Sequence, residues 1–293
     1  MVMPQDSPAT SPAQPAWRAR PARASRLVLA AALLALAAQG ALAQDKTAAP
    51  AAAPARIDPK ALAILKASCA ALAAARTMSF TATDTYEHAA RNGQPLYYTV
   101  KDQVTLQRPD KLKVIKVGDG IPDEFYYNGK VVMAYVPSED LVAVADAPPT
   151  VDQMLSSAWD KAETHFPFAD VIVSDPCDVF DEGLKSAFYV GQSQVVGGGV
   201  TTNIIALTTD HAQGEMWIGA EDHLPRLIRT NYPGEPARAN YETAYSDWRI
   251  GDPVDASAFT SAKAAAAKRI AFQPPSAAGG QDASAAASQS QAK

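Results

Sequence analysis

The stretch Leu96–Gln107, LYYTVKDQVTLQ, alternates between two kinds of side chain over twelve residues. Its even-numbered positions are apolar apart from Asp102, and most of its odd-numbered positions are polar. Successive side chains of a strand point to opposite faces, so this period of two predicts a long antiparallel strand with one wet face. Asp102 interrupts the apolar face, which predicts either a bulge or a carboxyl group that faces a cavity.

The sequence on both sides of this stretch predicts further strands in close succession. Met78–His88 is rich in Phe, Thr and Tyr, and the dipeptide Asn128-Gly129 is typical of a tight hairpin turn. The remaining strands are expected at Lys111–Val117, Asp123–Tyr127, Lys130–Val136, Leu141–Ala145, Ser186–Val195, Thr202–Thr209, Glu215–Ala220, Leu224–Asn231 and Tyr241–Arg249.

Helices are expected before the strands and between two groups of them. Asp58-Pro59 combines an N-cap with proline at the first helical position, and the helix should end near Arg76. Thr150 can cap a second helix that runs to about Glu163, and the segment Phe166–Phe180 predicts one or two short helices.

This order of elements predicts the fold class. Consecutive strands without intervening helices lack the βαβ pattern of a parallel sheet. We therefore expect an α+β, mainly antiparallel fold: one strongly curved sheet of about 10–11 strands, with helices packed on its concave face. A two-sheet sandwich with peripheral helices is the alternative that periodicity leaves open.

The first 43 residues predict a cleavable secretory signal peptide. Four arginines precede the apolar run Leu27–Ala38, and small residues at Ala41 and Ala43 give a cleavage site before Gln44. As a helix this run would span about 18 Å, against roughly 30 Å of membrane hydrocarbon, which argues against an uncleaved anchor. We expect a soluble protein of the Gram-negative periplasm, with no transmembrane segment after cleavage.

Composition divides the rest of the chain and limits its partners. Residues 44–56 predict a flexible Ala/Pro linker, 57–273 a single folded domain, and 274–293 a disordered tail. Without the leader the chain keeps 22 basic and 30 acidic side chains, a net charge of −8. This charge argues against nucleic acid as a partner, because nucleic acids select clustered Lys and Arg.

The mature chain has two cysteines, Cys69 and Cys177. In an oxidising compartment such a pair often forms a disulfide, which we favour slightly over two buried thiols. No C-x-x-C motif is present, so the sequence gives no local signature of redox catalysis.

Motifs for catalysis, metals and cofactors are missing from the sequence. The four histidines have no metal-binding spacing, and the glycine run 197–199 lacks the Lys-Ser/Thr of a phosphate loop. Ser193 fails as a nucleophile because Val195 stands where the nucleophile-elbow motif needs glycine. We therefore expect no catalytic residue, no metal and no cofactor, and a hydrolase is the least favoured hypothesis.

Apolar side chains on the predicted strands give a more useful indication. An apolar concave face can leave a cavity under its helices for a hydrophobic guest, although ordinary core packing is the favoured explanation for any single residue. The candidate cavity residues are Leu96, Tyr98, Val100, Val104, Leu106, Phe125, Tyr127, Tyr135 and Trp217.

A series of short motifs resembles the LolA-like periplasmic proteins, and within them the family called domain of unknown function 2092. The resemblance covers residues 58–273 and rests on the segments Arg108–Val114, Tyr126–Lys130, Val136-Pro137, Tyr189–Gly191, Val196–Gly198, Trp217-Ile218 and Leu224–Arg226. It implies an unclosed antiparallel barrel with a helical lid. LolA-type carriers hold such a lid with an arginine, for which Arg226 and Arg229 are the candidates here.

Three functions follow from these observations. The leading hypothesis is a carrier or chaperone for a hydrophobic small molecule or a lipoprotein acyl chain. The second is an interaction or regulatory module that docks an envelope membrane protein. The third is a hydrolase, for which the sequence offers no nucleophile or metal site.

Overall fold

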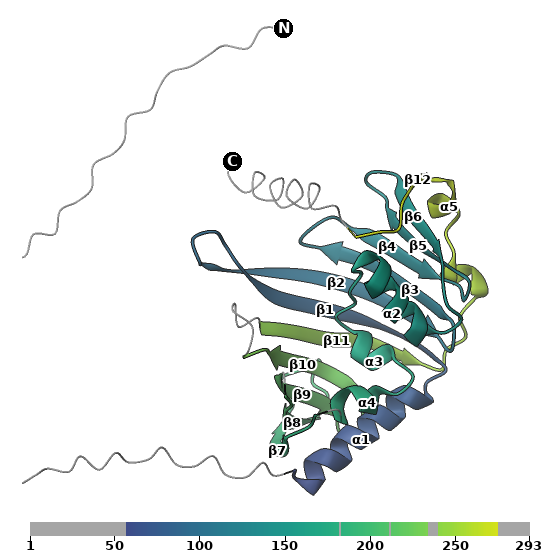
Figure 1. Ribbon diagram of the computed structural model, residues 1–293. Coiled ribbons are helices and arrows are strands. Elements are labelled where there is room, and N and C mark those ends of the chain that lie inside the picture. The colour runs from purple at the N-terminus through teal and green to yellow at the C-terminus, as the bar shows by residue number, and fades with distance from the viewer. Residues whose placement is uncertain (1–56, 182, 211, 234–239, 275–293) are drawn as a thin grey trace, which may run out of the picture. The chain divides into compact units, whose positions relative to one another are not determined.

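The fold is one antiparallel sheet that curves around its helices (Figure 1). The computed structural model describes residues 57–274 except 182, 211 and 234–239. The strands are β1 (Thr77–Ala89), β2 (Pro95–Gln107), β3 (Lys111–Gly118), β4 (Asp123–Tyr127), β5 (Val131–Val136), β6 (Leu141–Asp146), β7 (Ser186–Ser193), β8 (Thr202–Thr208), β9 (Gln213–Gly219), β10 (Pro225–Asn231), β11 (Asn240–Ile250) and β12 (Lys268–Ile270).

The twelve strands form a single sheet in the order β12-β6-β5-β4-β3-β2-β1-β11-β10-β9-β8-β7. Neighbouring strands pair antiparallel except β12, which runs parallel to β6. The predicted mainly antiparallel, unclosed sheet is therefore confirmed, and the two-sheet sandwich is excluded for the described residues. The predicted leader, the linker at 44–56 and the tail from residue 275 lie outside the described residues.

The strand order explains why helices cover one face of the sheet. Strands β6 and β7 are consecutive in sequence but stand ten strand spacings apart, roughly 48 Å along the sheet. The connection must cross the sheet, and it does so as a helical insert. The insert contains α2 (Val151–Ala162), α3 (Ala169–Ile172) and α4 (Pro176–Asp181), and α1 (Pro59–Ala74) lies on the same side (Figure 1).

Two apolar clusters fill the space between the sheet and these helices. One lies under α2 and α3, against β1–β5 and β11, and contains Phe80, Leu106, Phe125 and Phe168. The other lies under α1, against β7–β9, and is aliphatic, with Leu65 and Ile205 fully buried.

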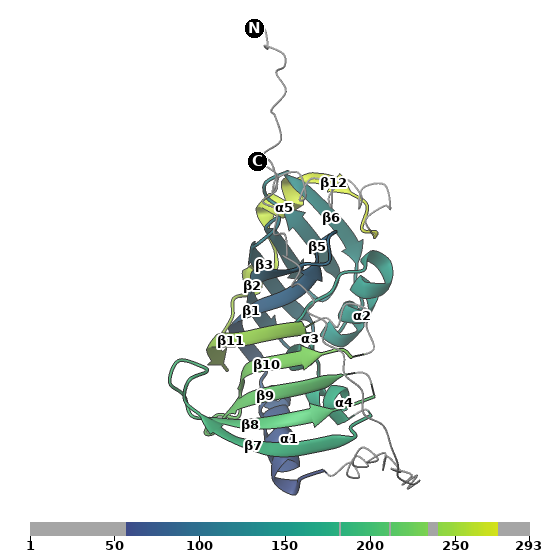
Figure 2. The ribbon, with the colours of Figure 1, turned by 90° about the vertical axis from the view of Figure 1, so that its left-hand side faces the viewer.

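The C-terminal segment covers the opposite face at one edge of the sheet (Figure 2). After β11 the chain forms η1 (Ala256–Phe259) and α5 (Ala262–Ala266), and Ala264 and Ala267 pack on Tyr126, Tyr135 and Val142. Strand β12 then extends the sheet beside β6. The sequence predicts none of these three elements, because each is short and lacks a clear apolar period.

The helix starts follow the predicted capping residues. The side chain of Asp58 accepts a hydrogen bond from the Lys60 amide at 2.8 Å, and Pro59 opens α1. Thr150 caps α2 by accepting from the Gln153 amide at 3.3 Å. Helix α2 ends at Ala162, and its C-cap residue Glu163, with a φ of 51°, turns the chain out of the helix.

Candidate functional site

The candidate site is the space between the sheet and residues 151–172, here called the α2–α3 hairpin. Aromatic rings make the contact: Phe166 meets Phe125 at a centroid distance of 5.0 Å, and Phe168 meets Phe80 at 5.8 Å. Both geometries are edge-to-face, which aromatic quadrupoles favour. The hairpin therefore closes the site with side chains of the same chemistry as the sheet beneath it.

Polar ties hold the roots of the hairpin at one end of the sheet. The Arg108 guanidinium donates to the carbonyl oxygens of Val173 at 2.8 Å and Ala75 at 3.2 Å. The Val151 amide donates to the carbonyl of Pro109 at 2.8 Å. These bonds meet at the turn between β2 and β3, so they fix the place where the hairpin enters and leaves the sheet.

The tip of the hairpin lies at the other end of the sheet, beside a cavity of about 230 Å³. His165 from the tip lines this cavity together with Tyr86, Val100 and Ile121. We call this region the mouth. Two large apolar side chains at its rim are open to solvent, since Trp159 is 55% exposed and Ile121 is 60% exposed, while Lys116 and Asp119 add charged groups to its lining. The Trp159 ring lies 6.2 Å from that of His165.

Two buried carboxyl groups stand on the helix-facing side of neighbouring strands. Asp102 in β2 pairs with Ala82, and Asp84 in β1 pairs with Val100, so the two acids are diagonal neighbours on one face. Asp102 is fully buried and Asp84 nearly so. Asp84 Oδ1 accepts from the Thr243 hydroxyl at 2.6 Å, whereas no described group donates to either oxygen of an ionised Asp102. A proton on one carboxyl group lets it donate to the other.

Burial raises the pKa of Asp102 to about 7, with Lys116 opposing the shift and the negative charge of Asp84 adding to it. The pKa of Asp84 is also raised, by burial above all, while its hydrogen bonds to Thr243 and Asp102 lower it. The pair therefore shares a proton near neutral pH. Because Asp102 has no exposed surface, we assign it no contact with a substrate.

The structure places the predicted cavity residues on two different faces. Seven of them face the helices: Leu96, Tyr98 and Val100 are half-buried at the mouth end of β2, and the others, Val104, Leu106, Phe125 and Tyr127, are buried in the core. Their role in ligand binding stays a prediction. Asp102 also faces this side, in a regular stretch of the β1–β2 pairing and not in a bulge.

Tyr135 and Trp217 differ from the prediction, because their side chains point to the face of the sheet opposite the helices. Tyr135 packs under α5, whereas its neighbour Ala134 packs with the helix-side core. Trp217 lies under the Arg229 guanidinium at 5.1 Å, and its neighbour Met216 is the residue that faces α1. Both strands are apolar on two faces here, so the alternation that assigns a side chain to one face is lost.

The arginine that holds the hairpin is neither of the two candidates. Arg226 binds Asp222 at 2.5 Å and the carbonyl of Leu224 at 2.9 Å. Arg229 binds Glu242 at 2.6 Å on the face without the insert. Arg108 ties the hairpin instead. Arg108 belongs to the Arg-Pro-Asp segment on which the family resemblance rests. Its place in that motif is the feature of the sequence that could have identified it.

The two cysteines are not bonded to each other in the described residues. Cys69 on α1 and Cys177 on α4 nevertheless pack in the same aliphatic cluster, so the disulfide predicted from the sequence is replaced by two thiols in one apolar contact region.

Comparison with known proteins gives the family. A family model described as a predicted periplasmic protein, domain of unknown function 2092, matches residues 61–273. The chain belongs to this DUF2092 family. The family description confirms the periplasmic localisation predicted from the sequence. A comparison with curated proteins returned no match.

Solved structures similar to this DUF2092 chain are distant. MucB in the Pseudomonas aeruginosa MucA/MucB complex is 15% identical, with a TM-score of 0.38 over 70% of this chain and 62% of that chain. LprF from Mycobacterium bovis is 13% identical (TM-score 0.39, 68% and 96% covered). The LolA superfamily protein NE2245 from Nitrosomonas europaea is 11% identical (TM-score 0.32, 69% and 97% covered). The chain thus spans less than two thirds of MucB, and these scores carry no argument about function.

Within the described ranges no group of three or more His, Cys, Asp or Glu side chains is placed to hold a metal ion. The helices described here also include none that is long and apolar enough to cross a membrane.

Proposed function

We propose that this DUF2092 protein is a periplasmic carrier or chaperone for a hydrophobic ligand, such as a lipid, an acyl chain or the acyl chain of a lipoprotein. The ligand would bind between the α2–α3 hairpin and the sheet. One observation carries the proposal: the helix-facing side of β1–β5 is an apolar surface interrupted only at Asp84 and Asp102 among its buried residues, and the hairpin that covers it is tied to the sheet at its roots.

The physical argument is an exchange of apolar contacts. Moving the tip of the hairpin away from the mouth would expose rings such as Phe125 and Phe80, at a cost of about 25 cal/mol for each Å² of apolar surface. An acyl chain that enters between hairpin and sheet covers the same surface and recovers that free energy. Val100 and Tyr98, at the mouth end of β2, would meet the ligand first.

Two measurements test the carrier function. Native mass spectrometry of the protein purified from its own cell envelope should find a bound lipid or fatty acid, and fluorescent fatty-acid probes should bind the delipidated protein. Arg108→Ala should speed probe uptake, because it removes both ties to Val173 and Ala75. Arg229→Ala, on the other face, is the matched control. Protein that is consistently ligand-free and takes up no probe contradicts the proposal.

A second candidate is an interaction module that docks an envelope membrane protein. The exposed apolar rim of the mouth favours it, because Trp159, Ile121 and Val117 present large side chains to solvent. Crosslinking in intact cells followed by pull-down separates the two candidates. A docking module yields one stoichiometric partner, which Trp159→Ala removes, whereas a carrier yields none.

A further inference from the structure

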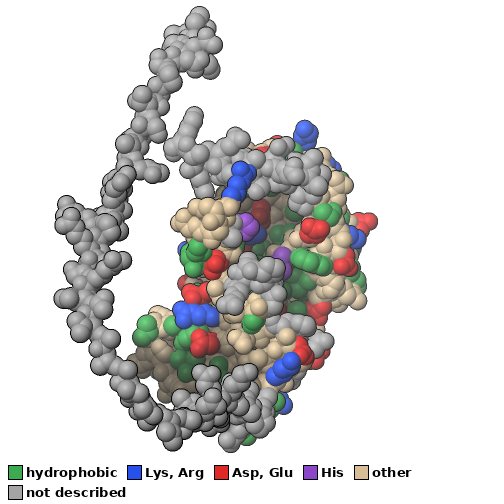
Figure 3. Space-filling view, turned by 60° about the vertical axis from the view of Figure 1, so that its left-hand side comes forward, with side chains coloured by type: hydrophobic (Ala, Val, Ile, Leu, Met, Phe, Trp, Pro, Cys, Tyr) green, Lys and Arg blue, Asp and Glu red, His purple; other side chains and the backbone are tan. Residues whose placement is uncertain are grey.

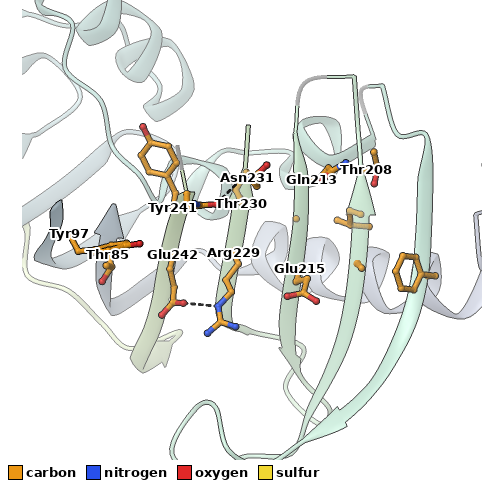
Figure 4. A pocket seen from close by; sticks show the side chains of 15 residues that line it. Thr85, Tyr97, Thr208, Gln213, Glu215, Arg229, Thr230, Asn231, Tyr241 and Glu242 are labelled. Atoms are coloured by element: carbon orange, nitrogen blue, oxygen red, sulfur yellow. Dashed lines mark hydrogen bonds and ion pairs between the residues drawn. The ribbon is translucent and has the colours of Figure 1, made fainter. Parts of the chain in front are cut away.

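The face of β7–β11 that α1 and α4 do not cover carries a groove of about 680 Å³ (Figure 4). This volume is in the range of ligand-binding sites in proteins. Side chains from β1, β2 and β7–β11 line it. The groove and the proposed acyl site lie on opposite faces of the sheet, so the two are separate.

The strand register sets one straight row of side chains across the groove. The residues directly opposite each other on successive strands are Thr85, Glu242, Arg229, Glu215, Ala206 and Phe188. Arg229 Nε binds Glu242 Oε2 at 2.6 Å, and the guanidinium lies over the Trp217 ring. This ion pair fixes the middle of the row (Figure 4).

A second row of amide and carboxylate side chains runs beside the first. The Asn231 amide donates to Asn240 Oδ1 at 2.7 Å, and the Asn240 amide donates to Glu87 Oε2 at 3.1 Å. Gln213 and Thr208 continue the row on β9 and β8. The hydrogen-bonded chain orients the asparagine side chains, so the groove presents donors and acceptors in fixed positions.

Exposed aromatic rings stand at both ends of these rows. Tyr97 on β2 is 65% exposed, and Phe188 on β7 is 52% exposed. The two strands are six strand spacings apart, roughly 29 Å along the sheet. The groove is therefore long enough for several units of a linear polymer.

We propose that this groove binds an unbranched, uncharged oligosaccharide. A sugar ring offers C–H faces that stack on aromatic rings, and hydroxyl groups that pair with amides, carboxylates and guanidinium groups. The groove supplies amides, carboxylates and a guanidinium group along its two rows, with an exposed aromatic ring at each end. A lipid tail would instead leave the hydrogen-bonding groups of the two rows unpaired.

The charges of the two rows exclude an anionic polymer. Glu87, Glu215 and Glu242 outnumber Arg229, whose charge is already paired. Among the described residues, acidic and basic side chains are interspersed over the face that Figure 3 shows. The groove therefore accepts neutral sugars and repels phosphorylated or sulfated ones.

The test uses the full mature chain, with N-acetylglucosamine tetramer and cellotetraose as probes. Calorimetry should detect binding of at least one of them, and Trp217 fluorescence should change because its ring underlies Arg229. Tyr97→Ala and Asn231→Ala should each weaken binding by about tenfold. Trp159→Ala, an exposed aromatic residue on α2, should leave it unchanged.

Three results would overturn the proposal. These are no binding of either oligosaccharide at millimolar concentration, binding that both groove variants leave intact, and binding of extended peptides at the groove in place of sugars. Tyr97→Ala and Asn231→Ala should leave fatty-acid probe uptake at the wild-type level. The result of the sugar-binding test is therefore independent of the carrier proposal.

Discussion

The two halves of the sheet bury different kinds of core under their helices. Under the α2–α3 hairpin the contacts are aromatic and include a carboxyl pair, Asp84 and Asp102. Under α1 the contacts are aliphatic, between one 16-residue helix and β7–β9. Helix α1 continues into β1 after only two residues, whereas the hairpin is tied through Arg108 and Val151 at its roots.

We expect this difference to separate a core that opens only on global unfolding from one that can open locally. Interlocked aliphatic side chains on a long helix unfold only with the whole domain, whereas short helices on flat rings can part from the sheet locally. The buried carboxyl pair further lowers the stability of the core under the α2–α3 hairpin at neutral pH. The effects of substitutions under α1 and under the α2–α3 hairpin should therefore differ in kind as well as in size.

The largest effect is expected for the aliphatic core. Leu65→Ala removes a fully buried side chain from under α1 and should lower the free energy of unfolding by about 3 kcal/mol. Urea denaturation measures this change, and the exposed Lys66→Ala on the same helix is the control. Leu65→Ala should leave fatty-acid probe uptake unchanged. A change in uptake together with the loss of stability would mean that the two cores do not behave differently.

The carboxyl pair should give the folded protein a pH dependence. A buried carboxyl group whose pKa is raised keeps its proton in the folded protein after the unfolded chain has released it. Stability should therefore fall as pH rises from about 4 to about 7. Asp102→Asn should flatten this slope and raise the free energy of unfolding at pH 8 by roughly 2–3 kcal/mol.

Denaturation of both proteins at a series of pH values tests the pair. Asp160→Asn, at an exposed position on α2, serves as the control. If the Asp102→Asn variant is less stable than the wild type at pH 8, the shared proton is not the source of the slope.

A smaller effect is expected at the roots of the hairpin. Arg108→Ala removes two hydrogen bonds to carbonyl oxygens and should lower the free energy of unfolding by about 1–2 kcal/mol. Hydrogen exchange should rise in residues 151–172 and stay unchanged in α1. The exposed Arg76→Ala, close by in the fold, should reproduce neither effect. Equal gains of exchange in both regions would show that the hairpin does not open separately.

The smallest effect is expected on the face without the insert. The Arg229–Glu242 ion pair is about half exposed, so Glu242→Ala should change the free energy of unfolding by less than about 0.5 kcal/mol. Thermal denaturation at low and high salt checks this value. A loss above about 1 kcal/mol would mean that this face carries part of the core stability.

Most of the fold could be predicted from the sequence because its strands are long and separated by clear turns. Leu96–Gln107 matches β2 to within one residue, and the caps at Asp58 and Thr150 start the two longest helices. The short elements could not be predicted from the sequence. Strand β12 has three exposed residues, and only its pairing with β6 makes it a strand.

The candidate site was only partly visible in the sequence. Period two placed the apolar residues of β2 on one face, but it could not assign Trp217, whose neighbours Met216 and Ile218 are also apolar. The carboxyl pair was missed for a different reason. Asp84 and Asp102 are 18 positions apart, and they meet only through the β1–β2 register. Acidic residues adjacent in sequence point to opposite faces and could not have shown it.

The pairing of β1 with β11 has a consequence for folding during export. The chain emerges with its N-terminus first, so β1 to β6 can form their meander from neighbouring segments. The second partner of β1 arrives only when Asn240–Ile250 has crossed the membrane. Until then a 13-residue strand edge has no neighbour and can pair with other chains. We therefore expect β1 to be the strand edge most exposed to aggregation until β11 pairs with it.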